Sequence, residues 1–323
     1  MPGMLNFNQL RSFYQVAKTL SFTAAAKELF ITQPGVTTHV KAFEEFCDLK
    51  LLKKRGRKVF LTDEGKILYE HARKIFETEK EIENTLEDMR KLNIGVLRLA
   101  STKTYARYFM PLLISNFHEA YPHIKIHLDE GSSRDMSRSL LDFRNEIAIV
   151  AMAEGHPHVQ FIPFSREQVV VIVSPEHPFA GRQGVRFAEL TAEPVIMKED
   201  GSGTRKLVNE LFAAYEATPD VLVETSNTEF IKQLVRRGEG IAFLVKEAVA
   251  QELEEGNLAL IHLREPLFLD VSIARLKGQP LSPAAKAFLD TLGAFWTEAT
   301  KPEGIGVLMA RILAKKRREK PSM

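Results

Sequence analysis

A group of polar side chains between residues 33 and 41 has the chemistry needed to read nucleic acid. Gln33, Thr37, Thr38, His39 and Lys41 are spaced so that a helix would present them together. A glutamine can form two hydrogen bonds to a base edge, a threonine can bond a base or touch a thymine methyl group, and a lysine can pair with phosphate. Taken alone, each is equally an ordinary solvated helix residue.

The segment 53-KKRGRKVFLT-62 decides between these two interpretations. It contains five basic residues around Gly56, followed by the apolar residues Val59, Phe60 and Leu61. This pattern predicts a β-hairpin with a cationic tip. Cations at such a tip gain affinity for DNA by releasing the counterions condensed on its backbone. The hairpin therefore favours nucleic-acid binding by the residues that precede it.

A second group of residues has the chemistry to bind a small anion. One part follows a predicted strand and precedes a helix, and another lies within 199-EDGSGTRK-206, where a helix begins. Backbone amides at a helix start form an anion site, and hydroxyl and guanidinium groups add donors. The candidates are Ser101, Thr102, Lys103, Gly201, Ser202, Gly203, Thr204 and Arg205, with Thr225 as a weaker contributor. The alternatives are an ordinary capped turn at Gly201–Thr204 and an ordinary helix cap near Thr225.

The sequence gives little support to enzymatic or metal chemistry. His156 and His158 form one histidine pair, and His123 and His127 form another, but neither has a third ligand at zinc-like spacing. The sequence has no Gly-x-Ser-x-Gly motif. Its single cysteine, Cys47, stands beside no plausible base and cannot form an internal disulfide, which fits a reducing cytoplasm. We expect no catalytic residue, no metal and no cofactor.

The nucleic-acid candidates require three helices and a hairpin to position them. An amphipathic helix follows Leu5, a short helix spans 22–30 after the cap Ser21, and a third spans about 33–46 after the cap Thr32. Pro34 suits the first turn of that third helix. The sequence thus predicts a winged helix-turn-helix over residues 4–62, as the DNA-binding domain of residues 1–62.

A long helix over residues 63–91 follows, opened by Thr62. An apolar stripe at heptad spacing runs along it, broken only by Glu79, through Leu68, Ala72, Ile75, Ile82, Leu86 and Met89. The N-terminal domain is too small to bury the whole stripe. We therefore expect the same helix of a second chain to pack against it. Packing within the chain is the alternative. A dimer would present two recognition helices to a palindromic site.

From residue 92 to 299 the pattern changes to alternating strands and helices, which predicts parallel sheets with crossover helices. The turn-rich segment 174-SPEHPFAGRQG-184 favours two lobes. The predicted strands are 96–100, 124–128, 147–151, 169–173, 194–197, 221–224, 241–245 and 269–275. The predicted helices lie near 105–121, 133–144, 204–217, 227–237, 246–254 and 282–299.

Charge is distributed unevenly over the 323 residues, although the formal net charge is only +2. Basic residues exceed acidic ones in residues 1–66 and again in the tail of residues 300–323, around a more acidic body. A basic module joined to an acidic one is expected when only one part meets a polyanion. The tail has two interpretations, a solvated segment or an auxiliary contact with DNA or another subunit. No apolar run could span a membrane and no secretory signal is evident, so we expect a cytoplasmic protein.

The sequence resembles the LysR-type transcriptional regulators. In the N-terminal part the matching words are 10-LRSFYQVAKTLSFTAAAKELFITQPGVTTHVKAFEE-45 and 61-LTDEG-65. Further matches are 111-PLLISNFHEAYPHIKI-126, 176-EHPFA-180, 234-LVRRGEGIAFL-244 and 282-SPAAKAFLDTL-292. Their order and spacing cover the chain to about residue 299.

This resemblance implies a winged helix-turn-helix dimer joined by a linker helix to a two-lobed α/β domain of periplasmic-binding-protein type, assembled as a homotetramer. The first lobe would span about 95–167 with 272–299, and the second about 168–271, within an effector-binding domain of residues 92–299. The DNA-reading positions would be Gln33, Pro34, Thr37, Thr38 and His39, with Lys41, Arg55 and Arg57 on phosphates. The family often has Ser-Arg-Gln near Thr38-His39-Val40, so the operator sequence is expected to differ.

The resemblance and the residues together predict a sequence-specific DNA-binding regulator that is switched by a small anionic effector bound between the lobes. The competing interpretation is a solute-binding α/β protein or an enzyme with an incidental basic N-terminus. The missing signal sequence opposes the first of these, and the missing set of acid, base and nucleophile opposes the second.

Overall fold

The computed structural model of the protein describes residues 4–56, 58–151 and 155–293. The contacts divide the chain into two compact units, Met1–Arg90 and Lys91–Met323, each of which is described by itself. The predicted phosphate contact at Arg57 and the basic tail of residues 300–323 lie outside the described residues.

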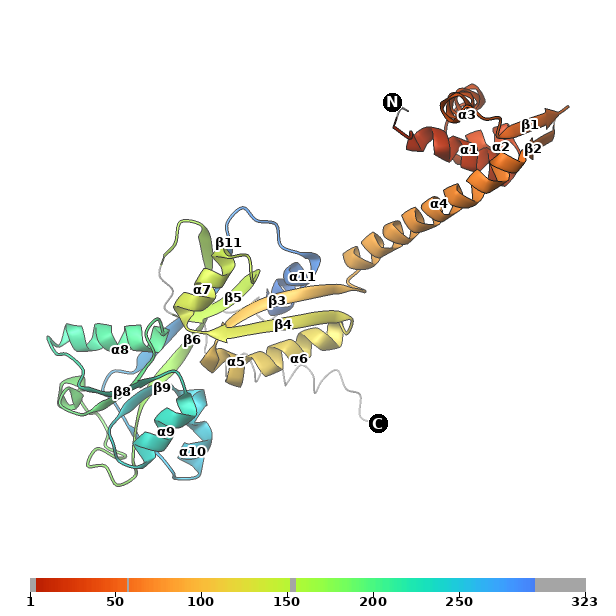
Figure 1. Ribbon diagram of the computed structural model, residues 1–323. Coiled ribbons are helices and arrows are strands. Elements are labelled where there is room, and N and C mark those ends of the chain that lie inside the picture. Colours follow the sequence, from red (N-terminus) through yellow and green to blue (C-terminus); the bar gives the residue numbers. More distant parts are fainter. Residues whose placement is uncertain (1–3, 57, 152–154, 294–323) are drawn as a thin grey trace, which may run out of the picture. The chain divides into compact units, whose positions relative to one another are not determined.

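The first unit is a winged helix-turn-helix followed by a long helix (Figure 1). Its elements are α1 (Phe7–Thr19), α2 (Phe22–Glu28), α3 (Gln33–Cys47), β1 (Leu52–Arg55), β2 (Lys58–Leu61) and α4 (Asp63–Arg90). The hydroxyls of Ser21 and Thr32 accept hydrogen bonds from the amides of Ala24 and Gly35, both at 3.2 Å. Both predicted helix caps are therefore confirmed, and Pro34 lies in the first turn of α3.

The apolar faces of α1 and α3 form the core of this unit, where Phe13 and Phe43 pack with ring centroids 5.6 Å apart. The hairpin adds Leu51 and Val59 to the same core. At Gly65 a Cβ atom would stand 2.1 Å from the carbonyl oxygen of Leu51, so only glycine allows α4 to begin this close to the hairpin. The hairpin and the start of α4 are thereby held in one rigid domain.

The apolar stripe of α4 divides into two parts. Toward its start, Leu68 and the fully buried Ala72 pack onto the core of the first unit. Glu79, which interrupts the stripe, forms two hydrogen bonds with the guanidinium of Arg11 in α1, at 2.5 and 2.7 Å. The other stripe residues are exposed, and these are Ile75 before Glu79 and Ile82, Leu86 and Met89 beyond it. Packing within the domain therefore explains the first part of the stripe and not the second.

The second unit is a mixed α/β domain. Its first elements are β3 (Gly95–Thr102), α5 (Lys103–Tyr108), α6 (Met110–Ala120), β4 (Ile124–Gly131), α7 (Ser133–Leu141), β5 (Ile147–Ala151) and β6 (Val159–Val173). Then follow η1 (Phe187–Leu190), β7 (Val195–Lys198), α8 (Gly203–Ala214), β8 (Val221–Thr225), α9 (Thr228–Arg236) and β9 (Ala242–Val245). The last are η2 (Lys246–Val249), α10 (Ala250–Glu254), β10 (Ala259–Ile261), β11 (Leu267–Leu276) and α11 (Pro283–Gly293).

The main sheet has seven strands in the order β10-β6-β11-β5-β3-β4, with β9 also pairing with β6. The strands β4, β3 and β5 are parallel to one another, as are β7 and β8 in a separate small sheet. The prediction of parallel sheets is wrong for β6, β9, β10 and β11, whose pairings are antiparallel. Residues 159–168, which the sequence left outside the strand predicted at 169–173, belong to β6 and give β11 an antiparallel partner.

Two groups of elements lie on either side of the long strands β6 and β11 (Figure 1). We call β3–β5, α5–α7 and α11 the first lobe, and β7–β10 with α8–α10 the second lobe. Both long strands contribute to both lobes, and their pairing shifts register between Val271 and Ser272. The lobes therefore share a continuous sheet.

Local sequence explains the other departures from the predicted elements. The helix expected over 105–121 is two helices, because the chain turns at Phe109 and Pro111 then occupies the first turn of α6. The helix expected over 282–299 is described as far as Gly293. No helix in the described ranges has the length and apolar character needed to cross a membrane.

Candidate functional site

The exposed face of α3 presents the residues that the sequence assigned to DNA reading. Gln33, Pro34, Thr38 and Lys41 are exposed, and Thr37 is half-buried. The side-chain amide of Gln33 donates to the hydroxyl of Thr37 at 3.0 Å, and the hydroxyl of Thr38 donates to the carbonyl of Pro34 at 3.0 Å. These bonds stay within α3, so the side chains can exchange them for bonds to a partner.

His39 differs from its neighbours because its ring also connects two helices. Its Nδ1 atom lies 2.9 Å from the hydroxyl of Ser12 in α1, and the residue is half-buried. One ring nitrogen is therefore committed to the fold, and only the remaining edge of the ring is available to DNA.

The hairpin carries the cations that the sequence placed on phosphates. Lys53, Lys54, Arg55 and Lys58 are all exposed, and no described carboxylate forms an ion pair with any of them. The ammonium of Lys54 lies 4.2 Å from the ring centroid of Phe22, at the start of α2. The hairpin is thus a cationic surface next to the helix-turn-helix, suited to a polyanion.

A narrow pocket, which we call the inner pocket, lies between the two lobes and has a volume of about 20 Å³. It brings together five of the predicted effector residues, which are Thr102, Lys103, Ser202, Gly203 and Thr204. Ser101 is fully buried, and neither it nor Thr225 lines a described pocket. The volume is enough for about one water molecule.

A larger pocket, which we call the outer pocket, adjoins the inner one and has a volume of about 540 Å³. It contains the remaining predicted residues, Gly201 and Arg205. The two pockets share Ser133, Ser202 and Gly203 as lining residues. The predicted effector residues are therefore divided between two adjacent spaces.

The glycines of the 199–206 segment allow the lobes to approach each other closely. A Cβ atom at Gly203 would stand 2.6 Å from the carbonyl oxygen of Ala151, and one at Gly201 would stand 2.9 Å from the hydroxyl of Ser132. Gly201 also has a φ of +78°, which favours glycine. The side chain of Ser202, at the N-cap of α8, makes no capping hydrogen bond. The turn is instead closed by the backbone, where the amide of Ser202 donates to the carbonyl of Glu199 at 3.2 Å.

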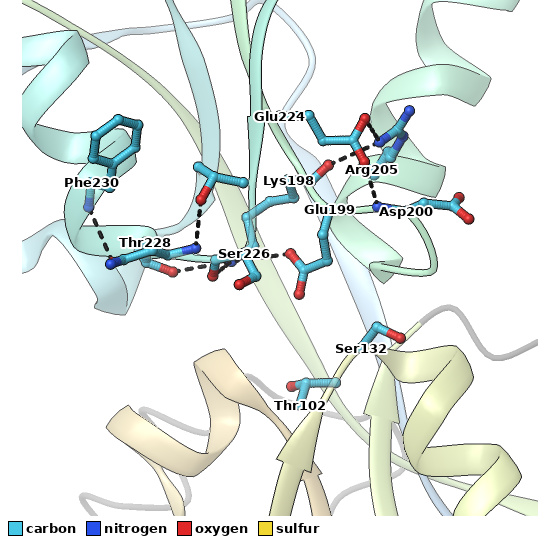
Figure 2. Close-up of polar contacts among 12 residues, drawn as sticks. Thr102, Ser132, Lys198, Glu199, Asp200, Arg205, Glu224, Ser226, Thr228 and Phe230 are labelled. Atoms are coloured by element: carbon cyan, nitrogen blue, oxygen red, sulfur yellow. Dashed lines mark hydrogen bonds and ion pairs between the residues drawn. The ribbon is translucent and has the colours of Figure 1, made fainter.

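Lys198 is the residue of the inner pocket that the sequence analysis missed. It is 5% exposed, and its ammonium donates to the carbonyl of Ser226 at 3.0 Å and to the hydroxyl of Thr228 at 3.1 Å (Figure 2). Burial lowers its pKa, the charge of Glu199 opposes this shift, and the charge of Lys103 adds to it. A lysine directly after a predicted buried strand and before 199–206 was the signal that could have identified it.

Glu199 lies beside Lys198 and is the acidic group of the inner pocket. Its Oε2 atom is buried without a hydrogen-bond partner among the described residues, 3.7 Å from the ammonium of Lys198. Figure 2 shows Thr102 and Ser132 of the first lobe opposite Lys198 and Glu199 of the second. Because Lys103 also lines the pocket, its two lysines face one carboxylate.

Two ion pairs among the described residues connect the lobes, Arg107 with Glu229 at 3.2 Å and Arg134 with Asp200, and the second lies at the edge of these pockets. The guanidinium of Arg134 lies 2.5 Å from the carboxylate of Asp200, and the amide of Arg134 donates to the carbonyl of Gly201 at 3.3 Å. The two charged side chains are 58% and 67% exposed. Solvent screening therefore keeps the contribution of this pair small.

The structure shows no group of three His, Cys, Asp or Glu residues that could hold a metal ion, within the residues it describes. The thiol of Cys47 is half-buried, and its pKa is raised mainly by burial. A raised pKa keeps the thiol protonated and unreactive.

Comparisons with known proteins agree with both units of the chain. Residues 7–66 match the family model "Bacterial regulatory helix-turn-helix protein, lysR family", and residues 90–297 match "LysR substrate binding domain". The chain is 33% identical to the HTH-type transcriptional activator CmpR of Synechocystis sp. over 286 residues, which are 88% of this chain and 94% of that protein.

Solved structures show the same architecture. Oxidized OxyR of Corynebacterium glutamicum has a TM-score of 0.74 at 21% identity, covering 94% of this chain and 99% of that one. The regulatory domain of Synechocystis PCC6803 CcmR in complex with 2-PG has a TM-score of 0.59 at 31% identity, covering 63% of this chain and 98% of that one. The chain therefore belongs to the LysR family of bacterial helix-turn-helix proteins, and it is a transcriptional regulator rather than an enzyme.

Proposed function

We propose that this regulator binds a small anionic effector at the inner pocket between its lobes. The observation that carries this proposal is the charge of the inner pocket, which has two lysines, Lys198 and Lys103, and one carboxylate, Glu199, paired with the ammonium of Lys198 at 3.7 Å. A buried charge costs free energy unless it is paired and hydrogen-bonded. A carboxylate, sulfate or phosphate group would balance the second of these lysines, and Thr102 and Thr204 would add hydroxyl donors.

The small size of the inner pocket would couple effector binding to a movement of the lobes. A space of about 20 Å³ cannot admit an organic anion, so the effector must bind an arrangement in which the lobes are further apart. A ligand that prefers one arrangement shifts the population toward it. The 2-PG complex of the CcmR regulatory domain, which is 31% identical to this chain, supports a small-molecule ligand in this unit.

The DNA-binding part of the proposal rests on the exposed face of α3 and on the hairpin. Gln33, Pro34, Thr37, Thr38 and His39 would face the bases. Lys41, Arg55 and Arg57 would contact phosphates. A protein with this role would act in the cytoplasm, where bacterial DNA lies.

The exposed apolar stripe of α4 favours self-association. Ile82, Leu86 and Met89 would pack against the same residues of a second chain, giving a homodimer with two recognition helices, and a tetramer would combine two such dimers. The chain would then comprise a DNA-binding domain (1–62), a linker helix (63–91), an effector domain (92–299) and a basic tail (300–323). Within the effector domain the lobes would span 95–167 with 272–299, and 168–271.

Titration calorimetry on the full chain tests the effector proposal, with acetate, sulfate, inorganic phosphate and small organic acids as probes. The variant Lys198→Met keeps the length of the side chain and removes its charge, and we expect it to weaken binding of the best probe by about tenfold to a hundredfold. Lys277→Met, at an exposed site outside both pockets, is the matched control. Unchanged binding in Lys198→Met, or no binding by any probe, would contradict the proposal.

Sedimentation of the variant Leu86→Glu tests the dimer. A buried carboxylate in the α4 seam should shift the protein toward monomers at micromolar concentration. Asn84→Glu adds the same charge at an exposed position away from the stripe and should leave the assembly unchanged. Identical sedimentation of both variants would show that the α4 stripe is not the contact.

A further inference from the structure

The outer pocket is large enough for a ligand of its own. Its volume of about 540 Å³ falls within the range of roughly 300–1,000 Å³ that is typical of small-molecule sites. The adjoining inner pocket has about 20 Å³. In this arrangement of the lobes, the outer pocket is therefore the space that an organic molecule can enter.

Cationic side chains stand on two walls of the outer pocket. α7 contributes Arg138, and α8 contributes Arg205 and Lys206. Arg138 is exposed, and no carboxylate among the described residues forms an ion pair with it. Arg205 pairs at 2.5 Å with Glu224, which is not among the lining residues. The cations of α7 and α8 could therefore bind two separate acidic groups of one ligand.

The acidic residues of the lining do not balance these cations. They are Asp200 and Glu210, against Arg134, Arg138, Arg205 and Lys206. The carboxylate of Asp200 is already paired with Arg134, and that pairing lowers its pKa. When Glu224 is counted as the partner of Arg205, four cations stand against three carboxylates, and the remaining excess of one positive charge favours an anion.

The remaining lining favours an organic ligand over a bare inorganic ion. Leu141 of α7 and the buried Val159 at the start of β6 provide apolar surface, and the ring of His156 lies beside them in the lining. Ser137 and Asn209 add polar groups that can bond to hydroxyls. A carbon skeleton can cover the apolar part while its acidic groups reach the cations on both walls.

We propose that the outer pocket is a second ligand site, for an organic molecule with two separated phosphate or carboxylate groups. One acidic group binds Arg138 of α7, and the other binds Arg205 and Lys206 of α8. This site goes beyond the proposed effector site, because it uses neither Lys198 nor the inner pocket.

The second site predicts antagonism between the two ligands. A molecule that bridges α7 and α8 holds the lobes together, whereas an effector in the inner pocket requires them to separate. Each ligand therefore lowers the affinity for the other by the same factor. The ligand of the outer pocket would therefore reduce the response of the protein to the effector.

Titration calorimetry on the full chain tests the proposal with four probes, which are fructose 1,6-bisphosphate, citrate, fructose 6-phosphate and inorganic phosphate. We expect the bisphosphate or citrate to bind at least tenfold more tightly than the two probes with one phosphate group. The difference between fructose 1,6-bisphosphate and citrate distinguishes phosphate from carboxylate recognition.

Three variants locate the site. Arg138→Met should weaken binding of the preferred probe at least tenfold, whereas Lys198→Met should leave it unchanged, so failure of this site is distinguishable from failure of the effector site. Arg144→Met, an exposed arginine that does not line the pocket, is the control. Equal binding of all four probes, no binding at millimolar concentration, or an unchanged Arg138→Met variant would overturn the proposal.

Discussion

The face of α3 and the inner pocket both present polar and cationic side chains, but they hold them in opposite ways. Gln33, Thr38 and Lys41 are exposed, and the two hydrogen bonds found for Gln33 and Thr38 stay within their own helix. Lys198 is 5% exposed and is fixed by Ser226 and Thr228, more than twenty residues away in the chain.

This difference fits the size of the two ligands that we propose. DNA is a large polyanion that brings its own dense charge, so side chains on a convex surface can find partners after contact. A small anion has few groups and must be desolvated, so its partners need to be positioned and buried beforehand. Changes on α3 should therefore alter binding and spare stability, whereas changes around Lys198 should alter both.

The largest expected effect is on the reading of bases. Gln33→Ala removes an amide that can form two bonds to a base edge, and we expect the preference for the DNA upstream of the protein's own gene over unrelated DNA to fall about tenfold to a hundredfold. Competition gel shifts measure this ratio. Glu45→Ala, at an exposed position near the other end of α3, is the control. A lower melting temperature for Gln33→Ala would contradict the expectation that changes on α3 spare stability.

Effector binding should depend on pH through Lys198. Its pKa is lowered by burial, so the side chain loses its proton at a lower pH than an ordinary lysine does. Anion affinity should be constant below that pKa and should fall by up to about tenfold per pH unit above it. Calorimetry between pH 6 and pH 10 would reveal the decline, and Lys198→Met should show no such decline.

Stability of the second unit should respond to the partner of Lys198. Thr228→Val keeps the shape of the side chain but removes the hydroxyl that accepts from the ammonium, at a cost of about 1–2 kcal/mol. For a unit of this size that corresponds to a melting temperature lower by roughly 2–8 °C. Thr218→Val, at an exposed site, should change nothing. Equal melting temperatures would mean that the Lys198 ammonium finds other partners at no cost.

A smaller effect is expected at the hairpin. Arg55→Ala should weaken binding to every DNA sequence by only a few-fold and should reduce the slope of log affinity against log salt by about 0.9. Fluorescence anisotropy over a series of salt concentrations measures both quantities. Arg237→Ala in the second lobe is the control, because it also removes one positive charge. An effect on one DNA sequence alone would assign Arg55 to base reading.

The smallest effect concerns the ion pair of Arg134 and Asp200, since Arg107 and Glu229 still join the lobes when it is removed. Asp200→Ala removes the partner of Arg134, and because both side chains are largely exposed, effector affinity should rise by at most about fivefold. Calorimetry with the best probe found for the wild-type chain measures the change. A weaker affinity would mean that Asp200 contacts the effector instead of restraining the lobes.

The same contrast explains what could be predicted from the sequence. The face of α3 follows from local signals, since the cap Thr32, the first-turn Pro34 and the spacing of Val36 and Val40 define a helix and its exposed side. Lys198 could not be found this way, because its burial depends on contacts with Ser226 and Thr228. Its position after an apolar strand is also compatible with an exposed strand end.

The strands show a similar limit. The parallel strands β3, β4 and β5 were predicted because each contains a short stretch that is apolar, as in β5, or alternates apolar with polar residues, as in β4. β6 was predicted only in its last third, since Pro163 and the charged residues Arg166 and Glu167 interrupt the apolar pattern. Antiparallel pairing with β11 compensates for those residues, and no local signal reports a partner about a hundred residues away.

The continuity of β6 and β11 has a mechanical consequence. The lobes are joined by two paired strands with a register shift at Val271 and Ser272, and an irregularity of this kind bends and twists a strand locally. Stretching or sliding the connection would break a row of backbone hydrogen bonds, whereas rotation about the strand pair would preserve them. Rotation about the β6–β11 pair is therefore the movement of the lobes that costs the fewest backbone hydrogen bonds.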